Sequence, residues 1–545
     1  MTPAVLVLII IASVLFATRF EDGRRPEYVG IPRGRDFIFA LAISSCLTAL
    51  GSVIFLLSGR AAFPFDDSYI TLSAARNLLL KGSLFLDPDH PLAGVTSPLH
   101  VAVVAALGVL TGIENASRAV GIAAHLMIAI AAFFLGRYYG RTRLAGIVSC
   151  VLVSLSGSFG YHQLNGMETT LFAALVAWTW CLGLKDHPSF ARLAALGAFL
   201  AAAVLTRPEG WFLVAAVYAD LGLRFVRERE KKNLVRLVFS AILMLALISP
   251  YLAANLHYTG HFLPTTAGAK AAFFKVANRG MAPGIVSTLL GIFKLCIRLP
   301  LLIPLFVLGL WDHLNQKPVR PAIFIFVLIF YASYLFRFGA GLNMYWLRYQ
   351  MPVLLVYIVF ASAGFSGLLD RLASKARSLA PRRVAAGLCF FLVLSMSAYE
   401  VSRMLKHYQD DVDSSTTVII PAARWVRDNT RPEALIAAHD IGGLYYFSAR
   451  KILDLVGLTD ADMAALHSKD VSRRLLWEHL ARRRPDYLVV FPAWDRDFFH
   501  FHEYDAAGVM SPVWKSEGME KPAAPEEVYR YEVYRCDWEK MKTAP

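Results

Sequence analysis

The chain contains 545 residues, of which 56% are hydrophobic and 18% are charged, and its mean hydropathy is +0.48. This composition excludes an ordinary soluble globular protein, so a polytopic α-helical membrane protein is the default interpretation. The formal net charge of +14 does not indicate nucleic-acid binding, because the basic residues cluster in short loops between apolar segments.

Apolar segments long enough to cross a bilayer recur along the chain, and we count about twelve of them. They lie near residues 3–18, 37–58, 118–136, 144–160, 168–184, 193–206, 209–223, 235–255, 285–311, 320–338, 350–370 and 384–400. We interpret the first as a retained helix, because it lacks a preceding basic region and a cleavage site. A shorter apolar piece near 98–110 is expected to lie at the membrane interface.

Lys and Arg residues concentrate after the first, third, seventh, ninth and eleventh spans, which the positive-inside rule places in the cytoplasm. The other polar loops are therefore predicted to face outward. We predict three parts: an N-terminal helix with a cytoplasmic loop (1–36), a transmembrane domain (37–400) and an extracytoplasmic domain (401–545). The first extracytoplasmic loop is expected to span 59–117.

The first outer loop carries an unusual polar sequence directly after an apolar span. Ser68 to Leu80 predicts a short helix, because apolar residues recur at helical spacing and Gly82 follows where helices commonly end. Asp66 and Asp67 fall at the start of this helix. One carboxylate is enough to cap a helix, so two indicate a chemical role, with simple capping as the alternative.

Further ionisable residues are predicted on the same outer face. They are His162, Glu168, Arg207, Glu209, His257, Lys270, Lys275, Arg279 and Arg348. Ionisable residues at membrane depth cost about 2.5 to 3.5 kcal/mol each, so they normally face water or a partner. We therefore predict a polar pocket that opens outward. Structural roles stay open: Glu168 can complement a helix N-terminus, and Arg207 can form an ion pair with Glu209. Arg348 can anchor the end of a span.

The composition becomes charged after residue 400, and apolar strands near 434–438, 451–456 and 487–491 alternate with helices near 422–429, 461–467 and 472–482. This alternation predicts a small α/β domain. His439 and Asp440 follow the first strand, where loops of α/β domains bind ligands, and buried turn chemistry is the alternative. A cluster of Asp, His and Glu at 495–503 matches no metal-site spacing.

The predicted pocket favours chemistry on a substrate that is already activated within the membrane. No phosphate-binding glycine loop is present, and we expect no nucleotide cofactor. A sugar linked to a lipid phosphate fits, with Asp66 or Asp67 as the general base for an acceptor hydroxyl. Lys270, Arg207 and Arg348 are candidate partners of the phosphate. A divalent cation shared by the two carboxylates and a phosphate is compatible with this arrangement.

Several segments together resemble the bacterial C-type (GT-C) glycosyltransferases. They are DDSYITLSAARNLLLKGS, GVTSPL, GMETT, TRPEG, PTTAGAK, RYQMP and HDIGGLYYFSARKILDLVGLTD. The resemblance implies a GT-C fold in the bacterial cytoplasmic membrane, with Asp66 and Asp67 holding the catalytic base. It also implies inverting transfer of a sugar from a polyprenyl-phosphate donor to a cell-envelope glycan or another hydroxyl acceptor.

Within that superfamily, the segments are most similar to the terminal β-(1→2)-arabinofuranosyltransferases of cell-wall arabinan synthesis, which implies arabinofuranose as the sugar. Thr265 departs from the asparagine that relatives often carry after the proline. Two other functions stay open. A flippase or transporter of lipid-linked sugars predicts internal symmetry or interrupted helices near the bilayer midplane. A non-catalytic envelope-assembly protein would instead use its C-terminal domain to bind partners.

Overall fold

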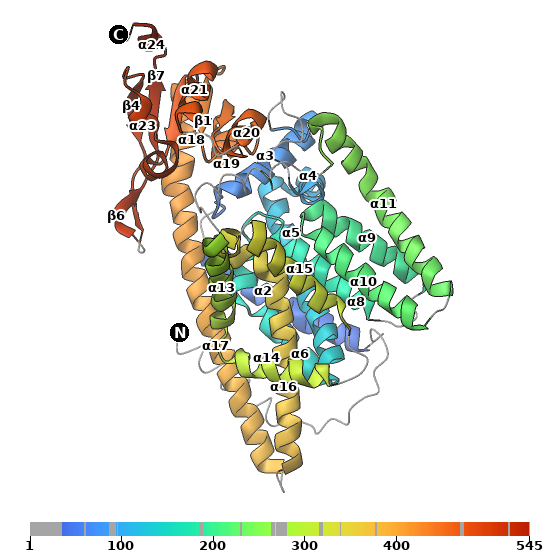
Figure 1. Ribbon diagram of the computed structural model, residues 1–545. Helices are drawn as coiled ribbons and strands as arrows, with labels where there is room; N and C mark the ends of the chain where they lie inside the picture. Colours follow the sequence, from blue (N-terminus) through green and yellow to red (C-terminus); the bar gives the residue numbers. More distant parts are fainter. Residues whose placement is uncertain are drawn as a thin grey trace.

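The computed structural model describes residues 35–58, 62–86, 94, 96–184, 189–228, 231–262, 268, 281–315, 320–337, 339–375, 379–468, 473–521 and 524–543. These residues form a bundle of helices that carries a small sheet domain at one end (Figure 1). The predicted architecture, a helical membrane protein with a C-terminal α/β domain, is therefore confirmed. The predicted span at 3–18 and Lys270 lie outside the described residues.

The bundle is built from long and short apolar helices. They are α2 (Arg35–Ser58), α3 (Asp66–Lys81), α4 (Pro98–Thr111), α5 (Ile113–Gly140), α6 (Arg143–Ser154), α7 (Gly157–Gln163), α8 (Thr169–Gly183), α9 (Phe190–Thr206), α10 (Gly210–Glu228), α11 (Lys231–Thr259), α13 (Met281–Arg298), α14 (Leu302–Leu314), α15 (Ala322–Arg337), η1 (Gly339–Asn343), η2 (Tyr345–Gln350), α16 (Met351–Lys375) and α17 (Leu379–Ser414). Within the described ranges, five helices are long and apolar enough to cross a membrane, or up to seven if each of two bent pairs is one span. The apolar helices α4, α8, α9 and α15 are shorter.

Two of the predicted spans are bent. The span near 144–160 bends by 52° between α6 and α7, and the span near 285–311 bends by 102° between α13 and α14. Pro300 lies in the second bend, where its missing N–H interrupts the helical hydrogen-bond ladder. After this bend α14 packs on α16, and a Cβ atom added to Gly364 of α16 would lie 1.9 Å from the Leu305 carbonyl oxygen. The two helices can approach this closely only because glycine stands there.

Arginine side chains satisfy the carbonyl groups at the C-terminal end of α8. Arg192 donates from Nε to the Leu182 carbonyl and from Nη2 to the Cys181 carbonyl, both over 2.7 Å. The last carbonyls of a helix have no partner within the helix, so these bonds satisfy two groups that would otherwise need another partner. They fix one end of a helix whose other end begins at Thr169, next to Glu168.

The long helix α17 leads from the bundle into the C-terminal domain and ends at Ser414, so the predicted boundary near residue 400 falls inside a continuous helix. The domain comprises η3 (a π-helical turn, Ser415–Ile419), α18 (Ile420–Asn429), β1 (Leu435–Ala438), α19 (Gly442–Ser448), β2 (Lys451–Asp454), α20 (Ala461–Ser468), α21 (Arg473–Arg483), β3 (Tyr487–Val490), α22 (Pro492–Trp494), η4 (Asp495–Phe499), α23 (Phe501–Tyr504), β4 (Met510–Lys515), β5 (Met519–Lys521), β6 (Ala524–Tyr529), β7 (Glu532–Cys536) and α24 (Lys540–Thr543).

The main sheet of the C-terminal domain has the strand order β2-β1-β3-β7-β4. β1 pairs in parallel with β2 and β3, while β7 is antiparallel to β3 and β4. The three parallel strands agree with those predicted from the sequence, and most of their residues are buried, as expected for strands covered on both faces. The domain lies at the same end of the bundle as α3 and α4 (Figure 1), and α19 packs on α3.

Candidate active site

The helix predicted at Ser68 to Leu80 is present as α3, which begins at Asp66 and ends before Gly82. Gly82 adopts the left-handed conformation (φ 66°) that terminates helices. Phe65 is the N-cap residue, and its side chain makes no capping hydrogen bond. Asp66 and Asp67 are instead the first two helical residues. Consecutive residues of an α-helix project about 100° apart, so the two carboxylates point in different directions.

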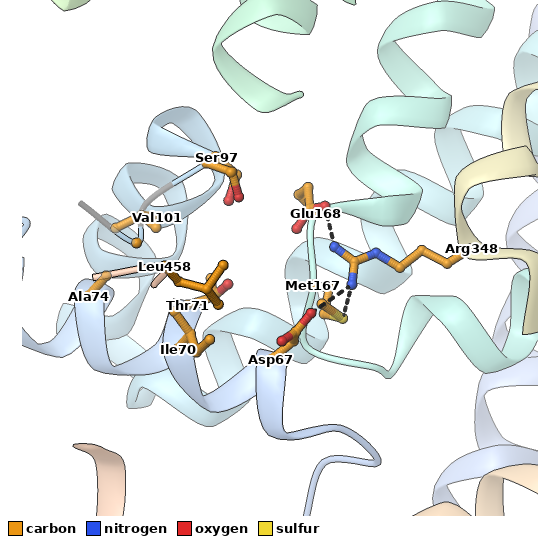
Figure 2. A pocket seen from close by; sticks show the side chains of 12 residues that line it. Asp67, Ile70, Thr71, Ala74, Ser97, Val101, Met167, Glu168, Arg348 and Leu458 are labelled. Carbon is orange, nitrogen blue, oxygen red and sulfur yellow. Dashed lines mark hydrogen bonds and ion pairs between the residues drawn. The ribbon is translucent and has the colours of Figure 1, made fainter. Parts of the chain in front are cut away.

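Asp67 lines an open pocket at the end of the bundle that faces the C-terminal domain. The other lining residues are Ile70, Thr71, Ala74, Gly94, Thr96, Ser97, Val101, Met167, Glu168, Arg348 and Leu458. Figure 2 shows α3 and the start of α4 on one side of the pocket and Glu168 and Arg348 on the other. Five separate stretches of chain therefore form one cavity, in which Asp67, Glu168 and Arg348 meet apolar side chains.

Arg348 connects the two carboxylates of this pocket, and its side chain is only 6% exposed. Its Nη1 lies 3.4 Å from Asp67 Oδ2, and its Nη2 lies 3.0 Å from Glu168 Oε1 (Figure 2). Nη1 also contacts the Met167 sulfur at 3.1 Å. The Arg348 Nε atom is also buried, and it has no hydrogen-bond partner among the described residues.

An unusual turn precedes Arg348. Tyr345, Trp346 and Leu347 have positive φ angles of 47°, 57° and 67°, although none of them is glycine. Each residue held in this left-handed region costs on the order of 1 to 3 kcal/mol. The surrounding contacts hold the turn: Trp346 stacks on His407 with ring centroids 3.8 Å apart. The turn redirects the chain at the start of η2, and the bundle thereby brings Arg348 to the pocket.

Behind the pocket, an ion chain extends from Glu168 into the bundle. Arg207 donates from Nη1 to Glu168 Oε1 (2.6 Å) and from Nη2 to Glu209 Oε1 (2.9 Å). Tyr334 donates its hydroxyl to the same Glu209 oxygen over 2.6 Å. The side chains of Arg207 and Glu209 are less than 10% exposed. The predicted Arg207–Glu209 pair is therefore present, as part of a longer chain of alternating charges that runs from Asp67 through Arg348, Glu168 and Arg207 to Glu209.

Asp66 faces the C-terminal domain, and it is not among the residues that line the pocket. Its Oδ2 accepts a hydrogen bond from the Gly442 amide and its Oδ1 accepts one from the Gly443 amide, both at 2.7 Å. Burial, followed by the neighbouring Asp440 carboxylate, raises the pKa of Asp66 well above its usual range, although the two amides act in the opposite direction. The acidic pair of the sequence is thus divided between two sites.

His439 and Asp440 directly follow β1, as predicted. Asp440 accepts a hydrogen bond from the Tyr531 hydroxyl over 2.8 Å. His439 is buried among aromatic rings, with the Trp494 centroid at 4.5 Å, and burial lowers its pKa to about 3. Neither residue lines the pocket, and a role for them in ligand binding remains a prediction.

No group of three or more His, Cys, Asp or Glu residues within the described ranges could hold a metal ion. In the acidic and histidine-rich segment after β3, Asp495 accepts a hydrogen bond from the Phe501 amide over 2.9 Å and also bonds to His502. This part of the segment therefore stabilises its own turns.

The sequence reasoning missed several residues that the structure places in or beside the site. Leu458 and Met167 line the pocket, Tyr334 ends the ion chain, and the amides of Gly442 and Gly443 bind Asp66. The two adjacent glycines after a strand were a usable signal, because backbone amides without a Cβ can be approached closely. The other three look like ordinary apolar or span residues in the sequence.

The chain resembles known proteins in two ways. Residues 406–534 match a family model described as a domain of unknown function, DUF8728. No protein of curated function matches the chain in sequence.

Solved structures with a similar fold cover almost the whole chain. ArnT from Cupriavidus metallidurans in the apo state has a TM-score of 0.56 and 13% identity, covering 92% of this chain and 99% of that one. The same protein bound to undecaprenyl phosphate has a TM-score of 0.56 and 13% identity, covering 91% and 98%. The archaeal oligosaccharyltransferase AglB from Archaeoglobus fulgidus, in complex with an inhibitory peptide and a dolichol-phosphate, has a TM-score of 0.53 and 12% identity, covering 91% and 74%. The chain has the GT-C membrane fold that these proteins share.

Proposed function

We propose that this protein is a membrane glycosyltransferase that transfers a sugar from a polyprenyl-phosphate donor to an acceptor hydroxyl. The observation that carries the proposal is the convergence of Asp67, Arg348 and Glu168 on one open pocket at the end of a GT-C bundle. Two proteins of similar fold were solved with lipids of the same class, an undecaprenyl phosphate and a dolichol-phosphate. These lipids support a polyprenyl-phosphate carrier here.

In the proposed reaction, Asp67 is the general base. Its carboxylate takes the proton of the acceptor hydroxyl while that oxygen attacks the anomeric carbon of the sugar. The bond between the anomeric carbon and the phosphate oxygen breaks, and polyprenyl phosphate leaves with the bonding electrons. Attack opposite the leaving group inverts the anomeric centre.

Arg348 has two roles in this proposal. Its Nη1 contact orients the Asp67 carboxylate, and its positive charge stabilises the negative charge that develops on the phosphate. Glu168 holds the guanidinium in place through Nη2. Arg207 and Glu209 lie one step behind, where they keep Glu168 charged and oriented. Lys270, which the sequence also suggests as a phosphate partner, stays a proposal that rests on the resemblance alone.

We further propose that the pocket and the C-terminal domain face the extracytoplasmic side of the bacterial cytoplasmic membrane. The distribution of Lys and Arg between the loops supports this orientation. Arabinofuranose as the sugar and a cell-envelope glycan as the acceptor rest on the resemblance of the motifs.

The test is a transfer assay with the purified full-length protein in nanodiscs. Radiolabelled polyprenyl-phosphate arabinofuranose and a polyprenyl-phosphate hexose are supplied separately with an envelope glycan fraction, and labelled product is measured. Asp67→Asn is expected to lower turnover by about 10² to 10⁴, the range for loss of a general base. Asp462→Asn, the same change at an exposed position on α20, serves as the matched control.

Two results would contradict the proposal. One is transfer by Asp67→Asn within twofold of the parent rate. The other is movement of the intact donor across proteoliposomes without cleavage of the sugar–phosphate bond, which would instead indicate a flippase.

A further inference from the structure

Asp66 forms a bidentate contact between the bundle and the C-terminal domain. Each of its carboxylate oxygens accepts one backbone amide, Gly442 on Oδ2 and Gly443 on Oδ1, both at 2.7 Å. A carboxylate bound through both oxygens is fixed in position and in orientation. The contact joins residues 376 positions apart in the sequence.

The C-terminal domain needs glycine where it meets Asp66. A Cβ atom added to Gly442 would lie 2.0 Å from the Asp66 carbonyl oxygen. A Cβ atom added to Gly443 would lie 2.4 Å from Ile419 Cγ2. Neither distance is tolerated between non-bonded atoms, so any larger residue at Gly442 forces α19 away from α3.

A second polar contact joins the same two helices. Arg76, further along α3, donates from Nη1 to the Tyr446 carbonyl (3.0 Å) and from Nη2 to the Tyr445 carbonyl (3.4 Å). Its guanidinium also lies 4.4 Å from the centroid of the Tyr446 ring. α3 therefore holds α19 at both ends, with a carboxylate at the amides and a guanidinium at the carbonyls.

The same domain contributes to the pocket wall. Leu458, in the loop after β2, lines the same pocket as Asp67, and its carbonyl oxygen would lie 3.9 Å from a Cβ atom added to Gly94, another lining residue. Asp67 directly follows Asp66 at the start of α3, so a shift of Asp66 moves Asp67 relative to Arg348. Their contact of 3.4 Å is already long for a charged hydrogen bond and will respond to a small displacement.

We propose that docking of the C-terminal domain through Asp66, Gly442 and Gly443 is required for transfer, because it positions Asp67 and completes the pocket. Asp66 is then a positioning residue, and Asp67 alone is the base. This inference rests on the proposed function. It assigns a role in turnover to two backbone amides of the domain that matches DUF8728.

The experiment compares Gly442→Ala with Gly222→Ala in the full-length protein. Gly222 lies in α10, and a Cβ atom there would meet nothing within 4 Å, so this variant is the matched control. Amide hydrogen exchange of residues 442–448 reports docking, and the transfer assay reports kcat and KM for the donor. Gly442→Ala is expected to accelerate exchange in 442–448 and to lower kcat about 10- to 100-fold, the effect of a displacement near 1 Å at a reacting group.

Asp66→Asn provides a second route if Gly442→Ala folds poorly. In this variant the side-chain NH₂ group replaces one accepting oxygen and faces a backbone N–H. The variant is therefore expected to show the same faster exchange in 442–448 and the same loss of kcat. Because both changes break one contact, the double variant should be no worse than the more severe single variant.

The inference is overturned if Gly442→Ala exchanges faster in 442–448 but retains parental kcat. It is also overturned if Asp66→Asn abolishes turnover without changing exchange, since Asp66 would then act in the chemistry itself. If the parent transfers no sugar from any donor, the proposed function fails. The exchange of 442–448 in Asp66→Asn still decides whether the carboxylate docks the domain.

Discussion

Replacement of Glu168 by glutamine tests the buried ion chain, because this carboxylate lies between two arginines. Its Oε1 accepts Arg207 Nη1 at 2.6 Å and Arg348 Nη2 at 3.0 Å, and its side chain is 5% exposed. Hydrogen bonds to a charged group contribute about 1.5 to 3 kcal/mol each, against about 0.5 to 1.5 kcal/mol for neutral ones. Glu168→Gln keeps an oxygen for both donors but loses the charge, and the two guanidiniums then repel one another. We expect a loss of about 3 kcal/mol in the free energy of unfolding.

The assay is thermal unfolding in detergent, followed by tryptophan fluorescence. Glu478→Gln on α21 is the matched control, because its ion pair with Arg474 is exposed and such pairs contribute less than about 1 kcal/mol. A double-mutant cycle with Arg207→Met isolates the coupling between the two residues. If Glu168→Gln unfolds at the parental temperature, or if the cycle shows no coupling, the ion chain does not stabilise the site.

Three further changes test other parts of the structure. Gly364→Ala places a Cβ 1.9 Å from the Leu305 carbonyl oxygen, so it should separate α14 from α16 and lower the melting temperature; an unchanged melting temperature contradicts this packing. Arg192→Met removes two bonds at the end of α8 and should cost about 1 to 3 kcal/mol, whereas Arg431→Met, at a highly exposed ion pair, should be nearly neutral. The buried His439 has a pKa of about 3 against 6.5 for the free side chain, so the unfolded state binds a proton first as pH falls. The contribution of His439 to stability should therefore fall by roughly 3 kcal/mol between pH 7 and pH 4, and in urea titrations the parent should lose about that much more stability over this range than His439→Phe.

Local patterns predicted the parts of the fold that depend on local interactions. The helix at Ser68 to Leu80 follows from apolar spacing and a terminal glycine, and β1, β2 and β3 follow from continuous apolar runs. The Arg207–Glu209 pair could also be anticipated, because its members are two residues apart. In each case the residues that decide the structure are neighbours in the chain.

Long-range pairing is what the sequence did not reveal. Glu168 bonds to arginines 39 and 180 residues away, and no local pattern encodes which distant cation meets which carboxylate. The sequence also did not show that the side chains of Asp66 and Asp67 reach two different sites. Adjacent residues of a helix point about 100° apart, so one sequence motif serves two separate surfaces.

Hydropathy also failed to show that an apolar segment can change direction between two helices. The segment near 285–311 is apolar throughout, but it turns by 102° where α13 gives way to α14. Strands β4 and β7 escaped the sequence reasoning because both mix polar and apolar residues, and three of the six residues of β4 are exposed. Burial of such a strand depends on its partner rather than on its own pattern.

The length of α17 has a consequence for how this protein can change during evolution. Its 36 residues extend about 54 Å at 1.5 Å per residue, well beyond the roughly 30 Å hydrocarbon core of a bilayer. A single-residue insertion would raise the attached domain by about 1.5 Å and rotate it by about 100°, which would carry Gly442 away from Asp66. Insertions and deletions in α17 should therefore be selected against, although none of its residues lines the pocket.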